Sequence, residues 1–350
     1  MELRNYLIKR WKITLISLTS FLFLSIFLSS MLGAARIDPS TTFLIILKKI
    51  PFLSAFFNNY SIDEAQEIII SEVRLPRVIA SALVGMALAS AGVVYQGIFR
   101  NPMADPYVIG SSSGASLGAS LAIFLLYNFF GVLSIPFFAF LGSFLAVMLV
   151  YRIARVGFRV PVTTLLLAGI ALSIFLSALV SLILTLAKEE LRAIIFWLLG
   201  GFGTVDWKSV LSILPFTFLG FTFILYYARE LNLIITGEES AEHLGVNVEL
   251  VKKRLIITSS LLTASAVSIS GLIGFVGLII PHIMRILIGP DHRILIPSSA
   301  LGGAIFLILA DSIARIILLP AELPVGIITA LAGGPFFIYL LKRKKGEYNL

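Results

Sequence analysis

The feature that most constrains the fold is residues 78–99, a run of 22 positions without a single Asp, Glu, Lys or Arg. A surface helix of a soluble protein needs a polar face, whereas a helix that crosses a bilayer needs about 20 apolar residues. Similar runs recur along the chain, and only 13% of its residues are charged, about half of the ~25% typical of soluble domains. The sequence therefore predicts an all-α, polytopic membrane protein.

About ten such runs fit into the 350 residues, which leaves no room for a sizeable soluble domain. Residues 1–350 are thus expected to form one transmembrane domain. The segments 36–75 and 188–208 are expected to be extracytoplasmic, the first with a short amphipathic helix at 41–50 that ends at Pro51. The expected spans are about 13–35, 76–99, 106–127, 132–151, 162–187, 209–228, 255–270, 271–289, 294–319 and 324–341.

The distribution of positive charge predicts the orientation. An even number of spans places both termini on one side, and two thirds of the 27 Lys and Arg residues flank the spans on that side. Positive loops stay in the cytoplasm, so both termini are expected to be cytoplasmic and the protein to lie in the cell membrane. The net charge of +8 then reflects membrane topology, and lipid rather than nucleic acid is the expected partner.

Small residues predict which spans are buried. Ala, Ser and Gly crowd positions 80–92, and Gly110, Gly114 and Gly118 follow at intervals of four in the next span. Small residues let helix backbones approach closely in lipid. Both spans are therefore expected to pack tightly against neighbouring helices.

Four stretches resemble, in the same order, the FecCD-type permeases. These are membrane subunits of ABC importers for iron–siderophores, haem and cobalamin. The stretches are RLPR at 74–77 with QGIFRNPMADPYVIGSSSGA at 96–115, GEESAEHLGV at 237–246, GLIGFVGLIIPHIMRILIGPDHR at 271–293, and LADSIAR with AELPVGIITALAGGPFF between 309 and 337.

The resemblance implies the type II ABC importer permease fold and transport of a metal chelate, with iron–siderophore, haem and cobalamin as the main candidates. The implied partners are a second permease subunit (a homodimer by the simplest reading), two ATP-binding subunits and an extracytoplasmic substrate-binding protein. It implies no enzymatic activity and no cofactor in this chain.

Arginines at the outer mouth of the bundle are the first candidate site. Arg74 and Arg77 precede the second span, and Arg315 lies near the outer end of the ninth. The residues alone favour snorkelling anchors at Arg74 and Arg77 and an ion pair from Arg315 to Asp311, one turn earlier. The resemblance implies that Arg74, Arg77 and Arg315 receive carboxylates of the binding protein, which suits the planar fork of arginine.

The polar hairpin after residue 99 is the second candidate site. Its residues alone predict a turn bounded by prolines. The resemblance implies that Asn101 and Met103 form part of a cytoplasmic gate, which closes against Val162, Thr163 and Thr164 at the start of the fifth span.

The longest polar loop, about 229–254, is the third candidate site. Thr236 and Glu239 have the spacing of a capping box, and Gly245 is a helix stop. Ala241 and Leu244 are expected on one face of the short helix between them. It could lie on the membrane surface, but its acidic face would be repelled by anionic lipid, which favours contact with a protein. The resemblance implies that Glu239, Ala241, Leu244 and Gly245 couple to the ATPase.

The sequence gives less support to an ATPase, a secondary transporter or an intramembrane enzyme. The chain has no GxxxxGK[ST] motif, so ATP hydrolysis would reside on a separate subunit. An ion-coupled secondary transporter of a small solute remains the alternative, although such carriers usually contain a buried acidic relay that is missing here. An intramembrane enzyme would need a catalytic pair inside the spans, and none is evident. Cysteine is absent and the three histidines have no ligand spacing, so no metal site is expected.

Overall fold

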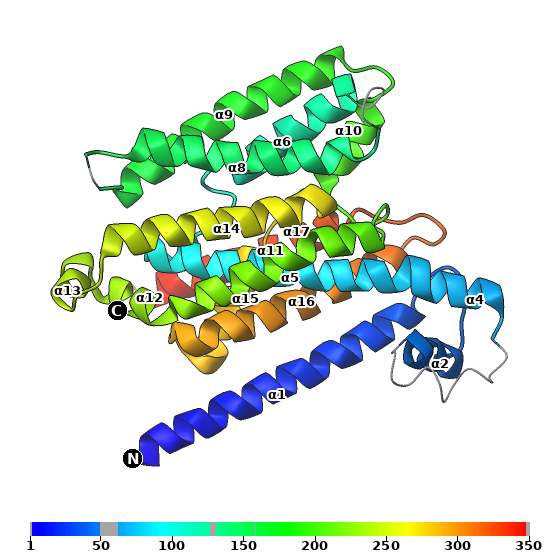
Figure 1. The fold of residues 1–350 in the computed structure, drawn as a ribbon, viewed down its shortest axis with the longest axis horizontal. Helices are drawn as coiled ribbons and strands as arrows, with labels where there is room; N and C mark the ends of the chain where they lie inside the picture. The colour runs from blue at the N-terminus through cyan, green and yellow to red at the C-terminus, as the bar shows by residue number, and fades with distance from the viewer. Residues whose placement is uncertain (1, 50–61, 127–130, 158, 348–350) are drawn as a thin grey trace.

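The computed structural model describes residues 2–49, 62–126, 131–157 and 159–347, and these residues form a bundle of helices without a β-sheet (Figure 1). Six helical segments are long and apolar enough to cross a membrane. They are α1 (Glu2–Met31), the continuous segment α4–η1–α5 (Glu64–Ile98), α8 (Ser134–Ala154), α9 (Val162–Leu186), α11 (Trp207–Tyr226) and α16 (His292–Ile316).

The other four predicted spans coincide with α14 and with three shorter apolar helices. These are α6 with its π-helical extension η2 (Ser111–Leu126), α14 (Val248–Ser270), α15 (Val276–Ile288) and α17 (Val325–Glu347). The prediction of an all-α polytopic fold is confirmed. Short helices connect the spans: α2 (Pro39–Lys49), α10 (Leu191–Leu199), α12 (Ala228–Thr236) and α13 (Glu238–His243).

Residues 64–75 of the expected outer segment 36–75 are helical, a feature that the sequence prediction did not specify. The carboxylate of Asp63 caps the first turn by accepting the Ala65 N–H at 3.3 Å, and α4 (Glu64–Ile68) continues through the π-helix η1 (Ile69–Arg74) into α5 (Leu75–Ile98). Pro76, which has no backbone N–H to donate, lies at the second position of α5, directly after the π-helical segment η1. The expected helix at 41–50 is α2, whereas Pro51 lies outside the described residues.

Helix α5 is the buried centre of the bundle, as its small residues predicted. It packs along α16 and also contacts α14, α11 and α15. A Cβ atom on Gly85 would overlap the carbonyl of Gly303, and one on Gly92 would overlap the carbonyl of Gly277. The glycines therefore permit a backbone approach that no other residue would allow.

Two of the three glycines spaced by four residues make the same kind of contact. Gly114 and Gly118 of α6 lie against Gly142 and Phe138 of α8. Gly110 does not belong to this row, because it precedes α6 with a left-handed φ of 87°. The prediction was wrong at that position, since the helix begins one residue later than the glycine spacing suggested.

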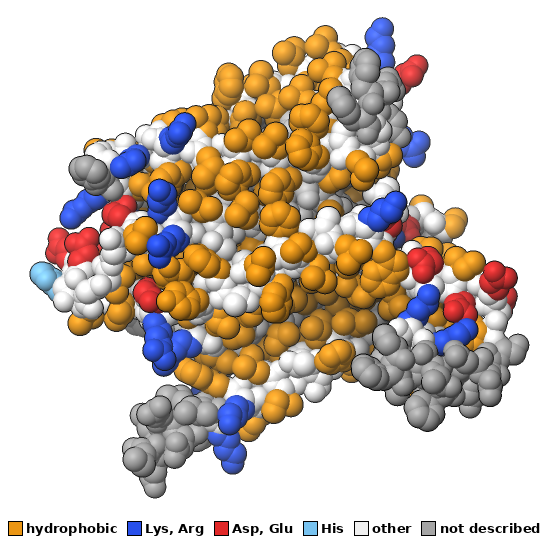
Figure 2. Space-filling model, viewed as in Figure 1, with side chains coloured by type: hydrophobic (Ala, Val, Ile, Leu, Met, Phe, Trp, Pro, Cys, Tyr) orange, Lys and Arg blue, Asp and Glu red, His pale blue; other side chains and the backbone are white. Residues whose placement is uncertain are grey.

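Apolar side chains cover the middle of the visible face, while charged side chains gather toward its two ends (Figure 2). Exposed large apolar side chains are numerous on α1, α8, α9 and α11. A belt of this kind is suited to lipid or to other transmembrane helices. Both chain termini lie toward the end that carries α13, hereafter the α13 end, and α2 and α4 lie at the opposite α2 end (Figure 1).

Candidate functional site

The arginines predicted for docking come together at the α2 end, but they are buried. Arg74 closes η1, Arg77 lies in the first turn of α5, and Arg315 lies in the last turn of α16. None is more than 8% exposed. Buried guanidinium groups need charge partners or carbonyl acceptors, and the structure provides both.

Asp311 is the shared carboxylate of this cluster. The Nε of Arg77 donates to its two oxygens at 3.0 and 3.1 Å, and the Nη2 of Arg77 donates at 2.9 Å. The Nε of Arg315 lies 3.1 Å from Asp311, which is the intrahelical ion pair that the spacing allowed. The remaining Nη1 of Arg77 donates at 2.7 Å to Glu322, which is 46% exposed and lies between α16 and α17.

Arg74 and Arg315 hold the end of α1. Arg74 donates to the carbonyls of Ser30 at 3.1 Å, Met31 at 2.8 Å and Ala35. Arg315 donates to the hydroxyl of Ser29 at 2.6 Å and to carbonyls at the end of α1. These two arginines therefore have a structural task in this chain, and neither projects outward as a free cation.

The predicted gate residues lie at the α13 end, in two segments. In the hairpin after α5, the side-chain oxygen of Asn101 accepts the N–H of Met103 at 2.9 Å, which fixes a tight turn. At the start of α9, the hydroxyl of Thr164 donates to the carbonyls of Pro161 and Ala154, while Thr163 is exposed. Thr164 thus joins α8 to α9 and does not point into the space beside the gate.

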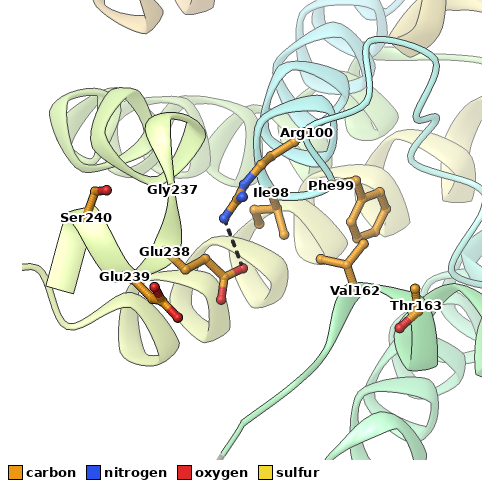
Figure 3. A pocket seen from close by; sticks show the side chains of 9 residues that line it. All are labelled: Ile98, Phe99, Arg100, Val162, Thr163, Gly237, Glu238, Glu239 and Ser240. Atoms are coloured by element: carbon orange, nitrogen blue, oxygen red, sulfur yellow. Dashed lines mark ion pairs between the residues drawn. The ribbon is translucent and has the colours of Figure 1, made fainter.

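A cavity of about 580 Å³ opens between three segments at this end (Figure 3). It is lined by the end of α5, the start of α9 and the turn into α13: Ile98, Phe99, Arg100, Val162, Thr163, Gly237, Glu238, Glu239 and Ser240. The structure thus brings Val162 and Thr163 of the predicted gate next to Glu239 of the predicted coupling helix. Asn101, Met103 and Thr164 are not part of the lining.

Helix α13 differs from its prediction in two respects. Ala241 is fully buried, whereas Leu244 is 65% exposed, so the two residues do not share a surface. The capping box is also absent, because the Thr236 hydroxyl donates to the carbonyl of Leu233 and Gly237 occupies the cap. Gly245 ends the helix as predicted, with a φ of 86°. Glu239 is exposed beside the cavity.

Sequence reasoning missed the residue that joins these segments, Lys252. Its ammonium group is buried and donates to Glu249 at 2.9 Å, to the Val160 carbonyl at 3.1 Å and to Glu238 at 3.3 Å. Glu238 also lies 3.6 Å from Arg100, the dashed ion pair in Figure 3. The spacing of Glu249 and Lys252 could have indicated an intrahelical pair. No sequence pattern indicated the contact between Lys252 and Val160, which lie 92 residues apart.

Among the described residues, no three Asp, Glu or His side chains lie close enough to hold a metal ion. His292 is buried, and its Nδ1 lies 2.8 Å from the side-chain oxygen of Asn232. His243 is exposed on α13.

The sequence of this chain is similar to those of known transport permeases. Residues 21–343 match the model of the FecCD transport family. The chain is 45% identical over 286 residues to the cobalamin import system permease protein BtuC of Halobacterium salinarum, which covers 82% of this chain and 76% of the relative. It is 41% identical over 297 residues to the hemin transport system permease protein HmuU of Yersinia pestis, covering 83% and 87%.

The fold is likewise similar to a solved structure. A metal-chelate type ABC transporter in an inward-facing conformation superposes with a TM-score of 0.81 and 36% identity, covering 94% of this chain and 98% of the solved one. The likeness therefore extends over the whole bundle and includes both candidate regions.

Proposed function

Because this chain belongs to the FecCD transport family, we propose that it is the permease subunit of a binding-protein-dependent importer that carries a metal chelate across the cell membrane. Family members are transport permease subunits, and ATP hydrolysis takes place on a separate subunit. The proposed complex contains a second copy of this chain, two ATPase subunits and an extracytoplasmic binding protein. The α13 end is then cytoplasmic, together with both termini.

The observation that carries this proposal is the exposed surface of α13. Leu244 is a large apolar side chain that lies 65% exposed at the polar end of the molecule, beyond the apolar belt. Glu239 is exposed on α13, which ends just before Leu244, and such a surface suits a groove in another protein better than anionic lipid. Helix α13 is therefore the proposed contact with the ATPase.

The proposed mechanism is alternating access. Closure of the ATPase subunits on ATP displaces α13, and the three segments around the cavity of 580 Å³ follow it. Asn101, Met103, Val162 and Thr163 then open or close the cytoplasmic exit. Two states of a packed interface are sufficient for this, provided that the ATPase binds one of them more tightly.

The substrate is proposed to be a bulky chelate such as haem, cobalamin or an iron–siderophore. The proposed path runs along α9 and α17, which contain no charged residue at 162–186 or 325–341. An apolar wall suits a large, weakly held complex better than a bare cation, which needs oxygen or nitrogen ligands. Uptake of cobalamin, hemin and a ferric siderophore into proteoliposomes that contain the complete importer would identify which chelate is carried.

The α2 end is the proposed docking surface for the binding protein. Arg74 and Arg315 are occupied by α1, so Arg77 is the arginine through which a partner carboxylate can bind most readily. Its Nη1 donates to Glu322, which is partly exposed and can be replaced by an incoming carboxylate. We expect Glu322→Gln to strengthen the stimulation of ATP hydrolysis by the binding protein. Unchanged stimulation would contradict this role for Arg77.

The proposed function is tested by purification in mild detergent after co-expression with neighbouring genes. A P-loop ATPase is expected in equal amount with the wild-type chain and strongly reduced with Leu244→Asp. Leu133→Asp is the matched control, because Leu133 is 76% exposed at the start of α8, away from α13. Recovery of the folded permease alone would instead favour a secondary transporter.

A further inference from the structure

The buried lysine of α14 is the starting point. Lys252 is only 2% exposed, and a buried ammonium group is costly unless each of its donors is satisfied. The Nζ of Lys252 has acceptors in Glu249, Glu238 and the Val160 carbonyl, at 2.9–3.3 Å. Such an arrangement fixes the relative positions of whatever segments carry the acceptors.

These acceptors come from three different segments. Glu249 is in the first turn of α14, Glu238 begins α13, and Val160 lies two residues before α9. The second oxygen of Glu249 accepts the N–H of Val160 at 3.1 Å, while Lys252 binds the Val160 carbonyl. Both backbone groups of Val160 are therefore held by side chains of α14, so the entry to α9 is fixed to that helix.

Glu238 differs from Glu249 because it lies near two cations at once, one buried and one partly exposed. It lies 3.3 Å from Lys252 and 3.6 Å from Arg100, which is in the turn after α5 (Figure 3). Glu249 alone can still neutralise Lys252 when Glu238 moves away. Glu238 can thus exchange between two partners without leaving a buried charge unpaired, which is what an element with two states requires.

We propose that Glu238 and Lys252 are the positioning residues that transmit a displacement of α13 to the start of α9. When α13 moves, Glu238 changes its distance from Lys252, and Lys252 shifts the backbone at Val160 and the adjacent Val162 and Thr163. This inference rests on the proposed function, because it assumes that an ATPase displaces α13. It names the residues through which that displacement is transmitted to the gate.

A second ion pair joins the same two regions and provides the control. Arg159 lies 3.9 Å from Glu242 of α13, but the side chains are 75% and 44% exposed. Exposed pairs contribute little to the coupling of two segments. Glu242→Gln thus removes the same charge from the same helix as Glu238→Gln, but leaves the buried connection intact.

The experiment uses the absence of cysteine from the chain. A single Thr163→Cys reports the start of α9, and its rate of labelling with a small maleimide is measured in the permease–ATPase complex, with and without ATP and vanadate. Thr163 is exposed and lines the cavity. A separate Ser240→Cys variant on α13 reports whether the ATPase covers that helix.

Nucleotide is expected to change the labelling rate of Thr163→Cys by about fivefold, the lower range of allosteric coupling between sites. Adding Glu238→Gln or Lys252→Met should abolish this response, while Glu242→Gln should preserve it. Glu238→Gln leaves Lys252 paired with Glu249, so this variant is expected to fold and to retain the ATPase.

Two results would overturn the inference while the proposed function stands. One is a full nucleotide response in Glu238→Gln. The other is an absent response of Thr163→Cys when the ATPase protects Ser240→Cys. A failure of the ATPase to protect Ser240→Cys would instead refute the coupling role of α13, and the inference would fall with it.

Discussion

The buried carboxylate of Asp311 should be one of the most sensitive side chains of the bundle. It lies between Arg77 and Arg315 with a side-chain exposure of 1%, and it accepts hydrogen bonds at 2.9–3.1 Å from Arg77. Asp311→Asn keeps the shape but removes the charge that neutralises two buried guanidinium groups. Removing one partner of a buried ion pair typically costs about 3–5 kcal/mol.

This loss is large compared with the ~5–15 kcal/mol that stabilises a typical folded domain. The free energy of unfolding would be measured in mixed micelles by titration with SDS. Tryptophan fluorescence is the signal, because the indole N–H of Trp207 donates to the Ser71 carbonyl at 2.9 Å close to the start of α5. Unfolding at the α2 end should therefore change its emission.

Glu322→Gln is the matched control, because it removes the charge of the other carboxylate that pairs with Arg77. Glu322 is 46% exposed, so its loss should cost no more than about 1 kcal/mol. The free energy of unfolding should therefore differ clearly between Asp311→Asn and Glu322→Gln. Equal losses, or a loss below about 1 kcal/mol for Asp311→Asn, would show that water or neighbouring groups compensate the arginines.

Further predictions concern packing and pH. Gly85→Ala should lower the free energy of unfolding by about 1–3 kcal/mol, because its Cβ would overlap the Gly303 carbonyl, whereas Gly203→Ala, which has open space around it, should change it little. Equal effects of these two substitutions would contradict the role of close backbone packing. The hydrogen bonds from Arg293 lower the pKa of Asp291 to about 2, so the stabilisation from this carboxylate should be present above its ordinary pKa and be lost as the pH falls toward about 2. Unfolding measured against pH should show a smaller loss on acidification in Asp291→Asn, and an unchanged pH profile would contradict this assignment.

Much of the fold followed from the sequence because lipid imposes simple requirements on a chain. A backbone in hydrocarbon must satisfy its own hydrogen bonds, so an uncharged run of 20 residues has little choice but to be helical. The small residues of 80–92 likewise identified the most buried helix, since they serve close approach. Gly110 shows the limit, because glycine also permits a left-handed φ, and spacing alone does not distinguish these two uses.

The candidate site was less predictable because its contacts are long-range. The sequence located Arg74, Arg77 and Arg315 at one end, but their burial depends on α1 and on Glu322, which are far away along the chain. The hydrogen bond between Lys252 and Val160 likewise joins residues that are far apart along the chain. Helix amphipathicity placed Ala241 and Leu244 together, whereas packing of α13 against the bundle buries only the first.

The way Arg74 holds α1 has a consequence for how that helix can vary. All three of its acceptors are main-chain carbonyls, which every amino acid offers equally. Arg74 therefore binds the end of α1 through its backbone, and the exposed side chains along α1 are free to vary. There are two exceptions: Ser29, whose hydroxyl accepts from Arg315 at 2.6 Å, and Gly33, where a Cβ would approach the Arg74 guanidinium to 2.8 Å. Exchange of the exposed side chains of α1 for other apolar residues should be tolerated, provided that the helix ends at the same position and keeps Ser29 and Gly33.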